Sequence, residues 1–215
     1  MPSQELTAYL GGYVRRIVSG DDQAAWDSVR DGTNGTADAH ESDDLIKFEA
    51  WTNGSSMVGA RAFYTFTMPD DIVITGATLK CYSLIYGNAG YLIAGTRSDF
   101  HTDITTSDWD QVNFDKLYSD NSVSVSGGSW SWPFNQVGIN HLNGEGLVGQ
   151  NRELVIVQQL DYEDTLPTAS NTQGLIYDRD NASYYPRLTI NYIETSKLSV
   201  KSGNLSLKSG NIIIK

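Results

Sequence analysis

The chain has 215 residues, of which 26 are acidic and 15 are lysine or arginine, giving a formal net charge of -11. That length can bury a substantial core, and a hydrophobic content of 40% argues against a disordered chain. The negative charge disfavours nucleic acid as a partner, because phosphate binding needs a positive surface. No run of about 18 apolar residues is present to span a membrane. We therefore expect no nucleic-acid partner, because of the charge, and no membrane partner, because of the missing span.

The first 52 residues predict little regular structure before one clear strand. Residues 1–20 fit either a helix or an irregular first strand, although Gly11 and Gly12 argue against a long helix. Residues 21–44 read as a long loop with a helical turn at Gln23–Val29. Residues 45–51 alternate apolar and polar side chains, which predicts a strand.

The clearest signal lies between Arg61 and Leu84, where two alternating segments flank a break at residues 69–71. The first segment predicts a strand with one buried face, formed by Ala62, Tyr64, Phe66 and Met68, while Arg61, Thr65 and Thr67 face away. In the second, Ala77, Leu79 and Cys81 alternate with Thr78, Lys80 and Tyr82. This pattern predicts that Cys81 is a small buried side chain.

The rest of the chain adds further short strands. We expect strands at residues 91–96 and 122–126, a helical turn starting at Ser107, a central strand at residues 153–160 and a closing strand at residues 187–192. Such short strands with almost no helical periodicity predict an all-β fold, an antiparallel jelly-roll-like β-sandwich over residues 1–193.

Residues 194–215 form a separate tail with an internal repeat. Lys201-Ser-Gly-Asn-Leu-Ser-Leu207 recurs as Lys208-Ser-Gly-Asn-Ile-Ile-Ile214, and residues 197–200 resemble the end of an earlier copy. Each unit reads as a turn and a small strand that cannot bury its apolar side alone. The tail therefore either packs on its own domain or pairs with other chains in a homo-oligomer, with a trimer favoured. The predicted oligomerisation residues are Leu198, Val200, Leu205, Leu207, Ile212 and Ile214.

Several sequence landmarks between about residues 9 and 192 resemble the DNRLRE-type β-sandwich domains, relatives of jelly-roll carbohydrate-binding modules. The segments that carry the resemblance are Gly12-Tyr13-Val14, Trp26-Asp-Ser-Val-Arg30, Arg61–Phe66, Met68-Pro69, Ile74–Tyr82, Phe134–Ile139, Asn143-Gly144, Leu154–Val157 and Tyr185–Tyr192. The resemblance implies a fold and a setting on secreted bacterial surface proteins or bacteriophage particles. The tail also resembles short repeats of phage tail and fibre proteins. Because residues 1–6 do not read as a signal peptide, we expect the phage setting.

Catalytic and metal-binding patterns are weak. His40, His101 and His141 share no spacing that would suit zinc. The carboxylates of Asp161-Tyr-Glu-Asp164 could form a glycosidase pair, but such a cluster after a strand more often lies in a solvated loop. We therefore expect no enzymatic activity, no catalytic residues, no metal ligand that can be named and no required cofactor. Calcium stays possible at three aspartate pairs, Asp21/Asp22, Asp161/Asp164 and Asp178/Asp180.

Aromatic side chains near loops suggest a second kind of function. They could stack on sugar rings, or they could close the ends of the core. The candidates are Trp109, Trp130, Trp132, Tyr184 and Tyr185.

Together these features predict a non-enzymatic virion structural protein, either a capsid decoration or a fibre- or tail-associated protein. We expect it to be made in the host cytoplasm and to contact other virion proteins. The alternative is a carbohydrate-binding module or host-adhesion domain that binds surface glycans.

Overall fold

A computed structural model of the chain describes residues 1–32, 35–41, 45–82, 90–95, 104–119, 128–144, 151–168, 173–177 and 183–195. All the strand pairs within these residues are antiparallel, and they form two sheets that pack face to face. The expected all-β sandwich is therefore confirmed.

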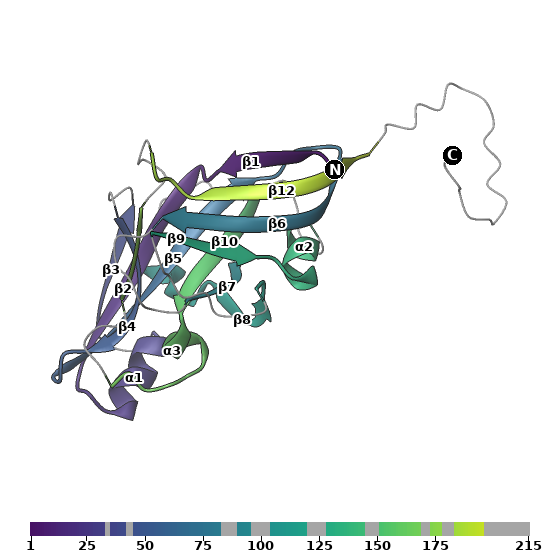
Figure 1. The fold of residues 1–215 in the computed structure, drawn as a ribbon. Helices are drawn as coiled ribbons and strands as arrows, with labels where there is room; N and C mark the ends of the chain where they lie inside the picture. Colours follow the sequence, from purple (N-terminus) through teal and green to yellow (C-terminus); the bar gives the residue numbers. More distant parts are fainter. Residues whose placement is uncertain are drawn as a thin grey trace, which may run out of the picture.

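The smaller sheet has four strands among the described residues, in the order β1-β12-β6-β9. Figure 1 shows it along one side of the molecule, with the N-terminus beside the end of β12. β12 is the closing strand that the sequence predicts, and it lies between β1 and β6. The bounds are β1 Ser3–Thr7, β6 Ile72–Tyr82, β9 Ser129–Pro133 and β12 Arg187–Glu194.

The larger sheet is built around β5. This strand pairs with β2 on one side and with both β4 and β10 on the other, while β3, β11, β7 and β8 extend the sheet outward. The bounds are β2 Leu10–Ser19, β3 Thr36–Glu41, β4 Leu45–Thr52, β5 Ser56–Thr67, β7 Gly90–Gly95, β8 Val112–Leu117, β10 Asn151–Gln158 and β11 Gln173–Tyr177.

The main core fills the space between the two sheets. Alternation along β6 sends Ala77, Leu79 and Cys81 inward, as the sequence predicts. They meet residues of the larger sheet, among them Ala62, Tyr64 and Phe66 of β5. Each large apolar side chain buried in this way stabilises the fold by about 1.5–3 kcal/mol before the entropy of ordering is subtracted.

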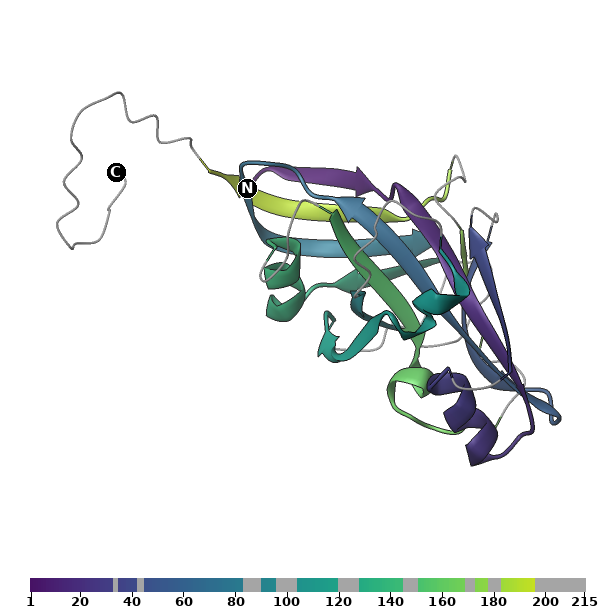
Figure 2. The ribbon, with the colours of Figure 1, turned by 180° about the vertical axis from the view of Figure 1, so that it is seen from behind.

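A second core covers the outer face of the larger sheet. Helix α1 (Gln23–Arg30), the 3₁₀ helix η1 (Thr106–Asp110) and α3 (Gln159–Tyr162) supply this cover. Figure 2 shows α1 and α3 together at one end of the molecule, away from β1 and β12. Arg61 and Phe63 are buried under this cover, and Thr65 on the same face of the strand is buried too. The prediction that this strand has only one buried face is therefore wrong.

The N-terminal twenty residues resolve into two strands and no helix. β1 and β2 are separated by Ala8 and Tyr9, so the apolar spacing that could suit a helix comes from two extended segments. Gly11 and Gly12 lie within β2, opposite Tyr64 and Phe63 of β5.

Two other elements differ from expectation and several agree with it. Helix α2 (Gln136–Leu142), which the side chain of Asn135 caps, forms where the sequence predicts no helix. β8 forms in residues 112–117, where the sequence predicts no strand. α1, η1, β4, β7 and β10 lie where the sequence predicts them. The strand expected at residues 122–126 lies outside the described residues. Within the described part of the chain, no helix combines the length and the hydropathy needed to cross a membrane.

Candidate interaction site

The three tryptophans proposed as a sugar platform belong to the interior. Trp109, Trp130 and Trp132 are each 0% exposed. Trp132 Nε1 donates a hydrogen bond of 2.9 Å to the Gly90 carbonyl, and Trp109 Nε1 donates one of 3.0 Å to the Arg30 carbonyl. No sugar ring can stack on side chains enclosed in this way, so the prediction is wrong for these three residues.

The two tyrosines of that prediction lie elsewhere, next to the smaller sheet. Tyr184 is 47% exposed and contacts Tyr82 of β6, with ring centroids 5.4 Å apart. Tyr185 is half-buried beneath Arg187, whose guanidinium carbon lies 4.5 Å from the ring centroid. For Tyr184 and Tyr185 the glycan-binding role stays a prediction.

The outer face of the smaller sheet surrounds these tyrosines with polar and charged side chains. Lys80 and Arg187 lie opposite each other on β6 and β12. The Lys80 ammonium lies 4.9 Å from the centre of the Tyr82 ring, and Arg187 pairs with Glu5 of β1 at 3.3 Å. This face therefore offers an exposed aromatic ring beside two cations.

The free edge of the smaller sheet is β1. Four of its five residues are exposed, and only Leu6 is partly buried against the main core. Tyr192 N donates a hydrogen bond of 3.2 Å to the Pro2 carbonyl. Because antiparallel hydrogen bonds alternate along a strand, the N–H and C=O groups of Ser3, Glu5 and Thr7 are directed away from β12. In the described part of the chain, no strand pairs with this outer side of β1.

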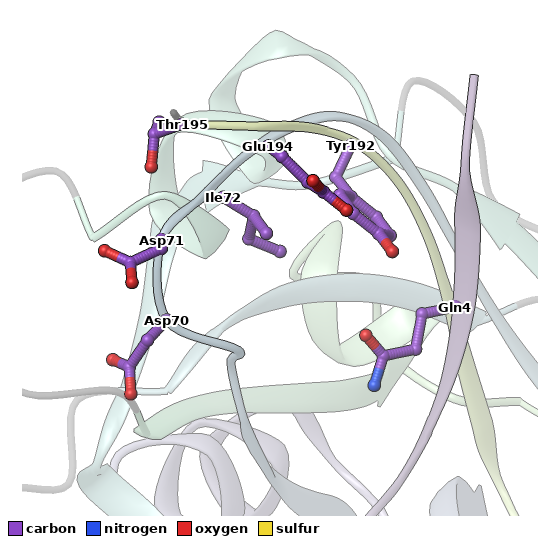
Figure 3. A pocket seen from close by; sticks show the side chains of 7 residues that line it. All are labelled: Gln4, Asp70, Asp71, Ile72, Tyr192, Glu194 and Thr195. Atoms are coloured by element: carbon purple, nitrogen blue, oxygen red, sulfur yellow. The ribbon is translucent and has the colours of Figure 1, made fainter. Parts of the chain in front are cut away.

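An acidic hollow of about 410 Å³ lies where β1, β6 and β12 meet. Figure 3 shows Asp70 and Asp71 on the turn before β6, with their carboxylates directed away from Gln4 on β1 and from Glu194 at the end of β12. Asp71 adopts a positive φ of 58°, and its carbonyl accepts a hydrogen bond of 2.8 Å from Thr195 N. The hollow is lined by Gln4, Asp70, Asp71, Ile72, Tyr192, Glu194 and Thr195.

A bulge shapes the hollow. The register between β12 and β6 shifts between Asn191 and Tyr192, at the point where β12 approaches its end. Bulges bend a strand and redirect its side chains. Tyr192 thus both packs against the main core and lines the hollow.

The carboxylates of the Asp161–Asp164 segment hold the helical cover in place. Asp161 is 1% exposed and accepts two hydrogen bonds from Arg61, at 2.8 and 3.0 Å. Asp164 pairs with Arg30 at 2.8 Å, and Arg30 Nε also donates to the Asp161 carbonyl. Glu163 accepts a hydrogen bond of 3.0 Å from the Tyr91 hydroxyl. Each carboxylate of the segment therefore has a protein partner in the contacts between α3 and its neighbours.

Three of the aspartates proposed for calcium have other roles in the structure. Asp22 caps α1, accepting a hydrogen bond of 2.9 Å from Ala25 N, and Asp161 and Asp164 are paired with arginines. Asp178 and Asp180 lie outside the described residues. Among the residues that are described, no group of three or more His, Cys, Asp or Glu side chains could hold a metal ion.

The described histidines do not come together. His40 stacks on Tyr13 at 4.6 Å, and His141 packs on Tyr118 at 4.8 Å. Burial, helped by nearby Arg152 and Lys116, lowers the pKa of His141 to about 4, so its ring is neutral near pH 7. His101 lies outside the described residues.

The hollow and the β1 edge are sites that sequence reasoning missed. Asp70 and Asp71 read as a turn, and nothing in the sequence indicates that Glu194 and Gln4 lie beside them. The only signal is the isolated carboxylate pair at a strand break together with Glu194 at the start of the repeat tail. The predicted oligomerisation residues of that tail lie outside the described residues; these are Leu198, Val200, Leu205, Leu207, Ile212 and Ile214.

Comparison with protein-family models finds no match, and comparison with curated proteins finds none either. The resemblance to DNRLRE-type domains therefore stays a prediction.

Proposed function

We propose that this chain is a non-enzymatic structural protein of a virion that displays its β-sandwich outward and associates with further copies of itself through the repeat in residues 197–214. Its place in the particle would be that of a capsid decoration or of a fibre- or tail-associated protein. The repeat supports this setting, because it resembles the short repeats of phage tail and fibre proteins.

One observation carries the self-association. β12 is held between β1 and β6, and the buried apolar residues described in the two cores all lie at or before Ile190. The described cores are thus formed by residues that precede the repeat. The predicted repeat strands cannot bury their apolar side alone, so they would be available to other chains.

The test is the solution mass of the full-length chain, measured by light scattering over a range of concentrations. We expect an oligomer for the natural sequence and a monomer when Leu205, Leu207, Ile212 and Ile214 are all changed to Ser. The control is Ile213→Ser, a single Ile-to-Ser change at the position between the two apolar positions of the second repeat, and it should leave the oligomer intact. A natural chain that stays monomeric at all concentrations would overturn the proposal.

The exposed ring of Tyr184 favours a second candidate function, a carbohydrate-binding or host-adhesion domain. Its contact with Tyr82, beside Lys80, provides a stacking surface next to a cation. Stacked aromatic rings suit the apolar faces of sugars, and the cation would favour an acidic glycan.

A glycan array followed by titration tests this second function. We expect saturable binding that Tyr184→Ala weakens by at least about tenfold, since one anchoring ring commonly contributes more than 1.4 kcal/mol. Ile193→Ala, which truncates another exposed side chain of the smaller sheet, is the control. Binding unchanged in Tyr184→Ala, or no saturable binding to any glycan, would exclude this surface as the glycan site.

A further inference from the structure

We propose that the outer edge of β1 is the docking site for the C-terminal repeat of a second copy of this chain. The incoming segment adds as an antiparallel strand beside β1, and the lysine that follows it lies at the end of β1 near the acidic hollow. This inference rests on the proposed self-association and identifies the surface that performs it.

The β1 edge has the hydrogen-bonding groups that an added strand needs. The outward N–H and C=O groups of Ser3, Glu5 and Thr7 form a regular row, because β1 pairs with β12 without a bulge. Proteins that avoid edge pairing keep such strands very short or place charged side chains, prolines or bulges on them. β1 has five residues with one charged side chain, Glu5, and it has no proline or bulge, so its edge is only lightly protected.

The repeat has the size and pattern of a matching strand. Each unit places two apolar side chains two residues apart after a Ser-Gly-Asn turn, as in Leu205 and Leu207. In a strand added to β1, one side faces inward, next to the partly buried Leu6. The apolar side of the repeat would therefore extend the main core, which explains how it becomes buried.

The sandwich and the C-terminal tail carry opposite charges, which favours docking of one on the other. All 26 acidic residues lie before residue 196, together with 11 of the 15 lysines and arginines, which gives residues 1–195 a formal charge of -15. Residues 196–215 contain four lysines and no acidic residue, a charge of +4. The hollow lined by Asp70, Asp71 and Glu194 lies at the Ser3 end of β1, which is the end at which the lysine following an antiparallel strand on this edge would lie.

Strand direction favours the repeat of another copy over the chain's own. β1 and β12 are antiparallel, so the chain leaves Thr195 at the Ser3 end of β1. A strand antiparallel to β1 must enter at the Thr7 end, and the chain's own repeat would first have to run back along the whole edge. A second copy can enter from that end directly. Exchange of repeats around a ring of copies then closes the assembly.

The experiment compares full-length variants by light scattering. Glu5→Pro removes an outward N–H from β1 without touching the bonds to β12, and we expect it to be monomeric. Glu5→Ala is the matched control, since it loses the same ion pair with Arg187 but keeps the N–H; it should stay oligomeric. Circular dichroism verifies that both variants are folded.

A mixing experiment distinguishes docking of the repeat of a second copy from docking of the chain's own repeat. Glu5→Pro has an intact repeat and a blocked edge, whereas the variant with four serines in the repeat has an intact edge. Neither should assemble alone, but an equimolar mixture should form a heterodimer, detected by sedimentation with one variant fluorescently labelled. A mixture that stays monomeric would show that the repeat docks on its own chain or on another surface, and would overturn the inference.

A second variant keeps the inference testable if Glu5→Pro does not fold. The triple change Asp70→Asn, Asp71→Asn and Glu194→Gln removes three charges, and asparagine tolerates the positive φ of Asp71. We expect association at least about tenfold weaker. If the natural chain is an oligomer but Glu5→Pro or the triple variant assembles equally well, the docking surface is wrong while the proposed function stands. A monomeric natural chain would instead refute the proposed function.

Discussion

Arg61 shows how one buried cation fastens the helical cover to the larger sheet. Its guanidinium bonds to both carboxylate oxygens of Asp161 and donates a hydrogen bond of 2.7 Å to the Trp109 carbonyl. It also lies 4.0 Å from the centre of the Trp109 ring. Both partners of the ion pair are almost fully buried, so the desolvation of each charge is offset only while the other is present.

Removing one partner should therefore destabilise the fold strongly. We expect Asp161→Asn or Arg61→Met to lower the free energy of unfolding by about 3–5 kcal/mol, measured by urea denaturation. The double variant Arg61→Met with Asp161→Leu should lose less than the sum of the single changes, because no unpaired charge is left. Glu5→Gln, which breaks the exposed pair with Arg187, should lose about 1 kcal/mol or less. If the single variants at Arg61 and Asp161 lose no more free energy of unfolding than Glu5→Gln, the buried ion pair does not fasten the helical cover.

His141 predicts a pH dependence. Its pKa is lowered to about 4, mainly by burial, from an ordinary value of 6.5 that applies to the unfolded chain. The unfolded state therefore binds the proton more readily, and the neutral ring stabilises the fold fully above pH 6.5. That stabilisation is lost as the pH falls from about 6.5 to about 4. The free energy of unfolding of His141→Gln should fall less steeply across this window than that of the natural chain. If the free energy of unfolding depends on pH in the same way for His141→Gln and for the natural chain, the prediction is contradicted.

At the scale of elements, α1 connects local capping to packing on the sheet. The Asp22 side chain caps the helix through Ala25 N, and the helix buries Ala25, Trp26 and Val29 in the second core. Gly59 of β5 lets the cover approach closely, because a Cβ at this position would lie 2.7 Å from Val29 Cγ1.

The cap should have a measurable effect on stability. We expect Asp22→Ala to lower the free energy of unfolding by about 1 kcal/mol, since an N–H at the helix start loses its partner. Asp21→Ala is the matched control, because it removes a neighbouring exposed carboxylate that is not the cap residue, and it should change stability by less than about 0.5 kcal/mol. Chemical denaturation monitored by tryptophan fluorescence measures both. Equal effects at the two positions would contradict a capping role for Asp22.

Alternation along the chain predicts the elements that face the main core. The inward side of β6 and the closing strand β12 follow directly from it, because their opposite faces are solvated. The burial of Arg61 and Phe63 does not, since Arg61 bonds to Asp161 of α3 and to the Trp109 carbonyl of η1, Phe63 packs in the second core, and these helices lie far away in the sequence. The hollow is non-local in the same way, because Gln4, Asp70 and Glu194 meet only after β1, β6 and β12 are in register.

At the scale of the whole molecule, charge is divided between the sandwich and the tail. The formal charge of -15 on residues 1–195 makes two sandwiches repel each other, whereas the four lysines of the tail are attracted to either. Association through the repeat therefore combines burial of apolar side chains, which salt weakens little, with an electrostatic attraction that salt screens.

This combination predicts a partial sensitivity to salt. Raising NaCl from about 50 mM to about 500 mM shortens the screening length from above 10 Å to below 5 Å, and it should weaken association several-fold without abolishing it. Sedimentation across this range measures the association constant. The variant with Asp70→Asn, Asp71→Asn and Glu194→Gln should associate more weakly and depend less on salt, because three negative charges at that end of the sandwich are gone. If the natural chain and this variant respond to salt identically, the tail lysines do not act at the hollow. If association strengthens with salt, repulsion between the acidic sandwiches outweighs any attraction by the tail.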